Sequence, residues 1–243
     1  MENTQPSEPT NSDEQFWTDL GLKYEAAFGH DIGLHKVIQR YLKMLPASGL
    51  ILDCGPGTGK PVAAAIAESG RRVHGIDMSP GMVSLSRKAV PSGTFEVANM
   101  LEWAPTVSYD GAVASLSIFE LSRQEIATMS HAWFSWLKPG GLLLINTFGA
   151  EDCRQVKAGN YDADGQCANK VEWRFMSKTI LITLLTKAGW KVLLEKAGFE
   201  IVHTEEDLFT PPAAADCDPE PRYYIIAEKP SSTSRLQGDV SRH

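Results

Sequence analysis

Residues 51–61 read ILDCGPGTGKP, in which three glycines fall within five positions directly after a short apolar run. A glycine-rich loop at the end of a buried strand lets a ligand approach the backbone closely. The spacing excludes a triphosphate loop, G-x-x-x-x-G-K-[S/T], because Cys54 takes the place of the first glycine and Pro61 follows Lys60. It also weakens a dinucleotide loop, G-x-G-x-x-G, whose third glycine would fall on Lys60. The pattern that remains is D-x-G-x-G-x-G.

Strand and helix patterns alternate on both sides of this loop. We expect strands at 50–54, 72–77, 93–99, 109–117 and 142–148, and helices at 61–69, 79–89 and 122–137. This alternation predicts a doubly wound, Rossmann-like parallel sheet with right-handed crossovers. A later helix, 186–197, precedes strands at 199–209 and 222–229, and a Pro-rich loop rather than a helix joins those two strands. We therefore predict a seven-stranded α/β sheet, mostly parallel, with an antiparallel last strand.

Composition and charge limit the classes of function. The chain has 243 residues, enough for one larger α/β domain, and a formal net charge of -7, which argues against a nucleic-acid groove. No apolar run approaches the ~18 residues of a membrane span, and the start of the chain does not look like a signal peptide. The four cysteines form no CxxC pair or zinc-like cluster, so we expect reduced thiols, no metal and a cytoplasmic location.

The D-x-G-x-G-x-G pattern, Asp53 with Gly55, Gly57 and Gly59, resembles the first motif of the class I S-adenosylmethionine-dependent methyltransferases. The resemblance implies that S-adenosyl-L-methionine is the cofactor and that its aminoacyl chain lies on the loop, including Thr58. In the family the matching acidic residue binds the ammonium group of the cofactor, directly or through water. We expect a Cβ at Gly55 or Gly57 to block that approach.

Further motifs extend the resemblance in order from about residue 45 to 228. Asp77, which ends the second expected strand, would accept both ribose hydroxyls, the alternative being that it only caps the next helix. Met78 would lie along the adenine. Asn99 stands where the family usually has an acidic residue for the adenine amino group, with the Met100 or Leu101 backbone N–H serving the ring nitrogen. The segments DGAVASLSIFEL, WLKPGGLLLI and LLEKAGFEIV match the later motifs, and the first of them adds Ser115 to the cofactor site.

The resemblance also suggests how the chain is organised. We expect a disordered leader at 1–15, a helical N-terminal lid at 16–45, a methyltransferase domain at 46–229 and a disordered tail at 230–243. Within the domain the strand–helix rhythm stops at 149–180, which we interpret as an irregular insertion on the substrate side.

The reacting groups are less clearly marked than the cofactor loop. Glu120, just past the fourth strand, is a candidate general base, the alternative being a solvated carboxylate. His30 and Tyr24 could reach the substrate and the cofactor from the lid. The residues that could line the acceptor pocket, against a plain packing role, are Phe119, Trp173, Phe175 and Met176.

Together these features predict methyl transfer to a nucleophilic atom, with oxygen favoured, of a small metabolite like those of natural-product or quinone pathways. The protein would act as a monomer or homodimer, without a nucleic-acid or membrane partner. Two alternatives stay open: a non-methylating cyclase, isomerase or binding protein on the same fold, or an RNA or protein methyltransferase.

Overall fold

The computed structural model describes residues 20, 21 and 23–231. Residues 20, 21 and 23–28 form an N-terminal helical segment. The helices that follow are α2 (Ile32–Lys43), α3 (Val62–Glu68), α4 (Pro80–Ala89), α5 (Arg123–Trp136) and α6 (Lys187–Ala197). The strands are β1 (Leu50–Cys54), β2 (Arg72–Asp77), β3 (Thr94–Val97), β4 (Tyr109–Ser115), β5 (Leu137–Phe148), β6 (Cys167–Phe175), β7 (Lys178–Leu185), β8 (Glu200–Phe209) and β9 (Glu220–Glu228). The leader predicted at 1–15 and most of the tail lie outside the described residues.

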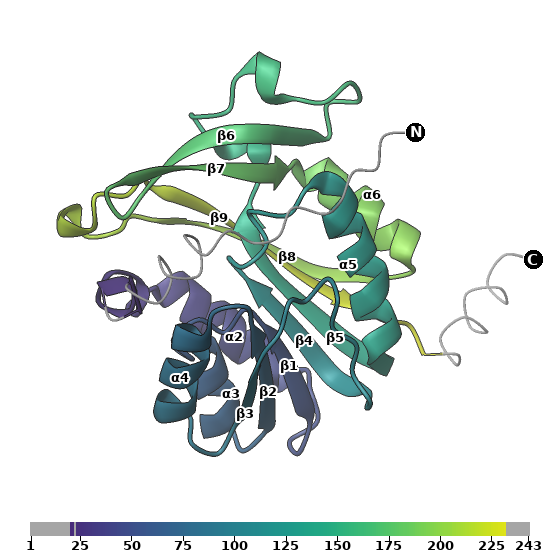
Figure 1. The fold of residues 1–243 in the computed structure, drawn as a ribbon. Helices are drawn as coiled ribbons and strands as arrows, with labels where there is room; N and C mark the ends of the chain where they lie inside the picture. The colour runs from purple at the N-terminus through teal and green to yellow at the C-terminus, as the bar shows by residue number, and fades with distance from the viewer. Residues whose placement is uncertain (1–19, 22, 232–243) are drawn as a thin grey trace, which may run out of the picture.

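Seven strands form one sheet in the order β3-β2-β1-β4-β5-β9-β8 (Figure 1). The pairs from β3 to β5 are parallel, whereas β9 runs antiparallel to both β5 and β8. The predicted doubly wound sheet with an antiparallel last strand is therefore confirmed. Its parallel order reverses between β1 and β4, so the carboxyl ends of these strands border a crevice where ligands bind in such folds.

Helices cover both faces of the sheet. Side chains of α5 and α6 pack with one face in a core that contains Trp133, Trp190 and Leu143. Those of α2, α3 and α4 pack with the other, around Tyr41 and Val113. The helix starts follow their sequence signals: Ser122 forms a capping box with Glu125 at α5, and Ser79 caps α4 ahead of Pro80.

The segment expected to be irregular, 149–180, differs from the prediction. It contains β6 and the start of β7, which form a separate antiparallel hairpin beyond the carboxyl end of β5 (Figure 1). The stretch VEWRF at 171–175 alternates buried and exposed residues, the period-two signal of a strand. Its buried side packs with Phe28 and Phe148 in a third core cluster, so this hairpin packs against both the N-terminal helical segment and the end of β5.

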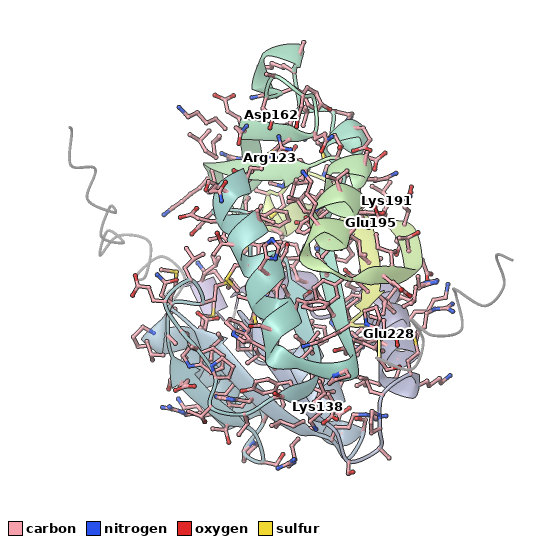
Figure 2. All side chains as sticks on the ribbon, turned by 90° about the vertical axis from the view of Figure 1, so that its right-hand side faces the viewer. Arg123, Lys138, Asp162, Lys191, Glu195 and Glu228 are labelled. Carbon is pink, nitrogen blue, oxygen red and sulfur yellow. The ribbon has the colours of Figure 1, made fainter. Side chains whose placement is uncertain are left out.

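An ion-pair cluster fixes the loop before the hairpin against α5. The guanidinium of Arg123 contacts the carboxylates of Asp162 and Asp164 at 2.6 and 2.8 Å (Figure 2 labels Arg123 and Asp162). These contacts link the N-terminus of α5 to the loop that precedes β6. No helix among the described residues is long and apolar enough to cross a membrane.

Candidate active site

The glycine loop follows β1, and each of its three glycines has a positive φ: 81° at Gly55, 57° at Gly57 and 84° at Gly59. The space around each glycine differs. A Cβ on Gly55 would lie 2.3 Å from the Cβ of Ser117, and one on Gly59 would lie 3.0 Å from the Cα of Ser86. A Cβ on Gly57 would meet nothing within 4 Å. A Cβ on Gly55 would therefore meet protein, whereas Gly57 borders open space. That a Cβ at either position would block the ligand stays a prediction.

The loop forms one wall of a cavity of about 210 Å³. Its polar end consists of the glycine loop with the carboxyl ends of β1, β2 and β3. Its aromatic end consists of the N-terminal helical segment, the carboxyl end of β5 and the β6–β7 hairpin. The polar end is lined by Asp53, Gly55, Gly57, Asp77, Met78, Asn99 and Met100. The aromatic end is lined by Tyr24, Phe28, Phe119, Phe148, Trp173 and Phe175.

Asp53 is a buried carboxylate without a hydrogen-bond partner. Its side chain is 1% exposed, and neither oxygen accepts a hydrogen bond from any described residue. Burial, with a smaller contribution from the charge of Asp77, raises the pKa of Asp53 from 3.8 to about 8. A bare carboxylate in this position favours a ligand that brings a positive charge.

Asp77 connects the loop to the next helix. One oxygen accepts the backbone N–H of Ser79 at 2.9 Å, and the other accepts that of Gly57 at 3.1 Å. Burial raises its pKa from 3.8 to about 6, although these two hydrogen bonds lower it. The helix-capping alternative is thus partly observed. Because a carboxylate offers about four lone-pair sites, two further donors can still bind Asp77 from the cavity.

The residues after β3 divide between the cavity and the loop itself. Asn99 lines the cavity, but its side-chain oxygen accepts the backbone N–H of Leu101 at 3.1 Å. Of the two backbone N–H groups expected to serve the ligand, that of Leu101 is therefore already paired, and Leu101 does not line the cavity. Met100 and Met78 do line the cavity, and Met78 is 38% exposed.

Of the other residues predicted to bind the cofactor, one lines the cavity and two do not. Ser115 lines the cavity, and its hydroxyl accepts the side-chain N–H of Asn146 at 3.0 Å. Thr58 and Gly59 are not among the lining residues, and the Thr58 hydroxyl is buried. Their place in the loop makes them part of its conformation rather than of the cavity wall.

Stacked rings form the aromatic end. Tyr24 stacks on Phe28 with ring centroids 4.7 Å apart, and burial raises the pKa of Tyr24 to about 12. Phe148 packs against Phe119 at 4.7 Å and against Trp173 at 4.9 Å. These walls are apolar and suit a flat apolar molecule.

The candidate catalytic residues do not lie together. Glu120 is exposed at the rim and lines the cavity. His30 is also exposed but is not among the lining residues. Met176, a predicted pocket residue, lies outside the cavity as well, at a second hollow beside Pro212 and Ala215. The structure therefore brings Glu120, but neither His30 nor Met176, to the aromatic end.

Three buried, charged residues that line the cavity were not predicted from the sequence: Asp31, Glu220 and Arg222. All three side chains are buried, and Arg222 lies within ion-pair distance of both carboxylates. Asp31 comes from the break before α2, whereas the other two begin β9. Glu220 and Arg222 stand at the start of a strand, EPRYYIIAE, that is otherwise mostly apolar, but this local pattern does not indicate that the two side chains are buried.

The Lys60 ammonium contacts the Glu25 carboxylate at 2.8 Å, so an ion pair links the glycine loop to the N-terminal helical segment. Among the residues that the structure describes, no three His, Cys, Asp or Glu side chains gather to hold a metal ion. The arrangement suits an organic ligand that carries a positive charge at one of its ends.

Comparison with known proteins agrees with this geometry. Residues 28–204 match the methyltransferase domain family, and the chain belongs to that family. It is 28% identical over 160 residues to a phosphoethanolamine N-methyltransferase from Plasmodium falciparum, and the match covers 60% of each chain. The resemblance seen in the sequence motifs is confirmed at the level of the family.

Solved structures share the fold. One is an S-adenosylmethionine-dependent methyltransferase from Methanosarcina mazei, with a TM-score of 0.65 and 22% identity, covering 81% of this chain and 98% of that one. Another is a Burkholderia thailandensis 1,6-didemethyltoxoflavin-N1-methyltransferase with bound S-adenosylhomocysteine, with a TM-score of 0.64 and 17% identity, covering 94% and 93%.

Proposed function

We propose that the protein transfers a methyl group from S-adenosylmethionine to a hydroxyl oxygen of a small organic molecule. The observation that carries the proposal is the buried, unpartnered carboxylate of Asp53 beside the open face of Gly57. These residues fit the ammonium group and the aminoacyl chain of that cofactor. The family membership and the cofactor analogue bound to the Burkholderia enzyme support the same assignment.

In this proposal the polar end of the cavity holds the cofactor. Asp53 binds its ammonium group, Asp77 accepts the ribose hydroxyls, and Met78 and Met100 contact the adenine. When bound, S-adenosylmethionine supplies an electrophilic methyl group on a sulfonium. The aromatic end orients the acceptor and excludes water, and positioning of this kind gives most of the rate gain in a displacement reaction.

A hydroxyl acceptor must lose its proton during transfer. Glu120, at the rim of the aromatic end, is the side chain that we assign to take it. The carboxylate of Glu120 would be a general base, in keeping with its position just past β4.

The test uses three acceptors that share one ring: phenol, aniline and benzenethiol. Each is incubated with the protein and with S-adenosylmethionine that carries a deuterated methyl group, and products are identified by mass spectrometry. The proposal predicts labelled anisole, in reduced yield with Glu120→Gln. Methylation of nitrogen or sulfur alone would overturn the choice of oxygen. Failure of the folded protein to bind S-adenosylhomocysteine would overturn the function itself.

A further inference from the structure

A buried cluster of charges stands at the aromatic end of the cavity, and the proposed transfer does not use it. Asp31, Glu220 and Arg222 are 1%, 2% and 1% exposed. The Arg222 Nη2 lies 3.3 Å from Asp31 Oδ2 and 2.5 Å from Glu220 Oε2. All three line the cavity. Groups of this kind are costly to bury, so their arrangement calls for a ligand or a structural reason.

The cluster holds Arg222 in a fixed place. Its guanidinium lies 5.7 Å from the ring centroid of Phe148 and 5.2 Å from that of Phe209. Both rings are near enough to attract the guanidinium through their faces, in addition to the two carboxylates.

The two carboxylates differ in their other partners. Asp31 caps α2, and its second oxygen accepts the backbone N–H of Leu34 at 2.8 Å. The start of a helix also favours a negative charge. Glu220 has no such support among the described residues beyond Arg222, and burial raises its pKa from 4.5 to about 7. Arg222 thus lies nearer to Glu220 than to Asp31, but Asp31 is also stabilised at the start of α2, so Glu220 is the carboxylate with fewer partners.

The excess charge defines the ligand chemistry. Two carboxylates against one guanidinium leave the ionised cluster with one net negative charge, which favours a positively charged group, although Nε and Nη1 of Arg222 are also buried without a hydrogen-bond partner among the described residues. The surrounding rings, Phe28, Phe148 and Phe175, add faces that attract a cation and an apolar body. We propose that the acceptor is a ring-bearing organic amine whose protonated nitrogen is bound by Glu220, apart from the atom that is methylated. This inference rests on the proposed function.

Benzylamine, benzyl alcohol and benzoate make a matched series of probes, because they place a cation, a neutral donor or an anion on the same ring. Each is titrated by calorimetry into the full chain, with and without saturating S-adenosylhomocysteine. The proposal predicts that wild type binds benzylamine most tightly and benzoate least. Benzoate binding as tightly as benzylamine would overturn it, and so would the absence of benzylamine binding.

Variants locate the effect. Glu220→Gln keeps the shape and removes the charge, so benzylamine affinity should fall about tenfold or more. Glu172→Gln changes an exposed glutamate of β6 that does not line the cavity, and it should leave benzylamine affinity unchanged. Equal affinity of wild type and folded Glu220→Gln for benzylamine would refute the amine site.

The two proposals can fail separately. Binding of S-adenosylhomocysteine without selective binding of benzylamine would leave the methyltransferase assignment in place and remove the amine site. Selective binding of benzylamine without binding of S-adenosylhomocysteine would leave an amine site in the cavity and remove the methyltransferase assignment, and with it the role of the amine as methyl acceptor. If Glu220→Gln does not fold, the order of the affinities of wild type for the three probes still tests the amine site.

Discussion

Replacing Asp53 by asparagine should stabilise the ligand-free protein, and the gain should depend on pH. The Asp53 carboxyl is buried and its pKa is about 8 in the folded chain, against 3.8 for an ordinary aspartate. The folded state therefore holds the proton more tightly than the unfolded state. Between these two pKa values, wild-type stability falls as pH rises, by about 1.4 kcal/mol per pH unit from this residue.

The expected magnitude follows from that slope. From pH 5 to pH 7, wild type should lose about 3 kcal/mol that Asp53→Asn does not lose. Asp77 and Glu220, whose pKa values are also raised by burial, are present in both proteins, so the comparison isolates Asp53. Urea unfolding of both proteins at the two pH values measures the difference. Identical pH dependence would refute the reasoning.

The same variant should bind the cofactor poorly. Loss of a buried, charge-assisted hydrogen bond costs about 1.5–3 kcal/mol, so S-adenosylhomocysteine affinity should fall roughly 10- to 100-fold. Methylthioadenosine lacks the ammonium group and is the matched control, with affinity expected to stay the same. An equal loss for both ligands would show that the variant damages the pocket rather than one contact.

Two further changes separate ligand contacts from structural ones. Gly57→Ala should weaken S-adenosylhomocysteine binding in calorimetry while a cooperative unfolding transition remains, whereas Gly55→Ala should lose that transition because its Cβ would overlap Ser117. Arg222→Met should lower the free energy of unfolding by about 3–5 kcal/mol at pH 7.5, since it leaves buried carboxylates unpaired. In urea unfolding, this decrease in the free energy of unfolding should be smaller at pH 5.5, where Glu220 is protonated. Equal decreases at pH 5.5 and pH 7.5 would contradict this account.

The sheet could be predicted because the alternation of strands and helices is a local pattern. The hairpin at β6–β7 was missed, since the alternation at 171–175 is short and lies in a polar segment. Its stability comes from packing against Phe148 and Phe28, distant in the sequence. Local strand signals of this length are ambiguous without that context.

The cavity residues, too, include some that the sequence predicts and some that it does not. Asp53 and Asp77 were found because each ends a strand beside the glycine loop, a relation that the sequence spacing contains. The charge cluster was not found, because Asp31 meets Glu220 and Arg222 only after the chain has folded. Charged residues at the start of a strand are usually solvated, and nothing local indicates that these are buried.

Calorimetric titration of S-adenosylhomocysteine into wild type and Asp77→Asn tests the central claim most directly. Asparagine can still accept one backbone N–H but cannot replace both carboxylate oxygens toward the ribose. We expect micromolar binding to wild type and affinity about tenfold or more weaker in the variant, with similar unfolding transitions. No binding to folded wild type, or equal binding to both proteins, would contradict the assignment of this cavity to the cofactor.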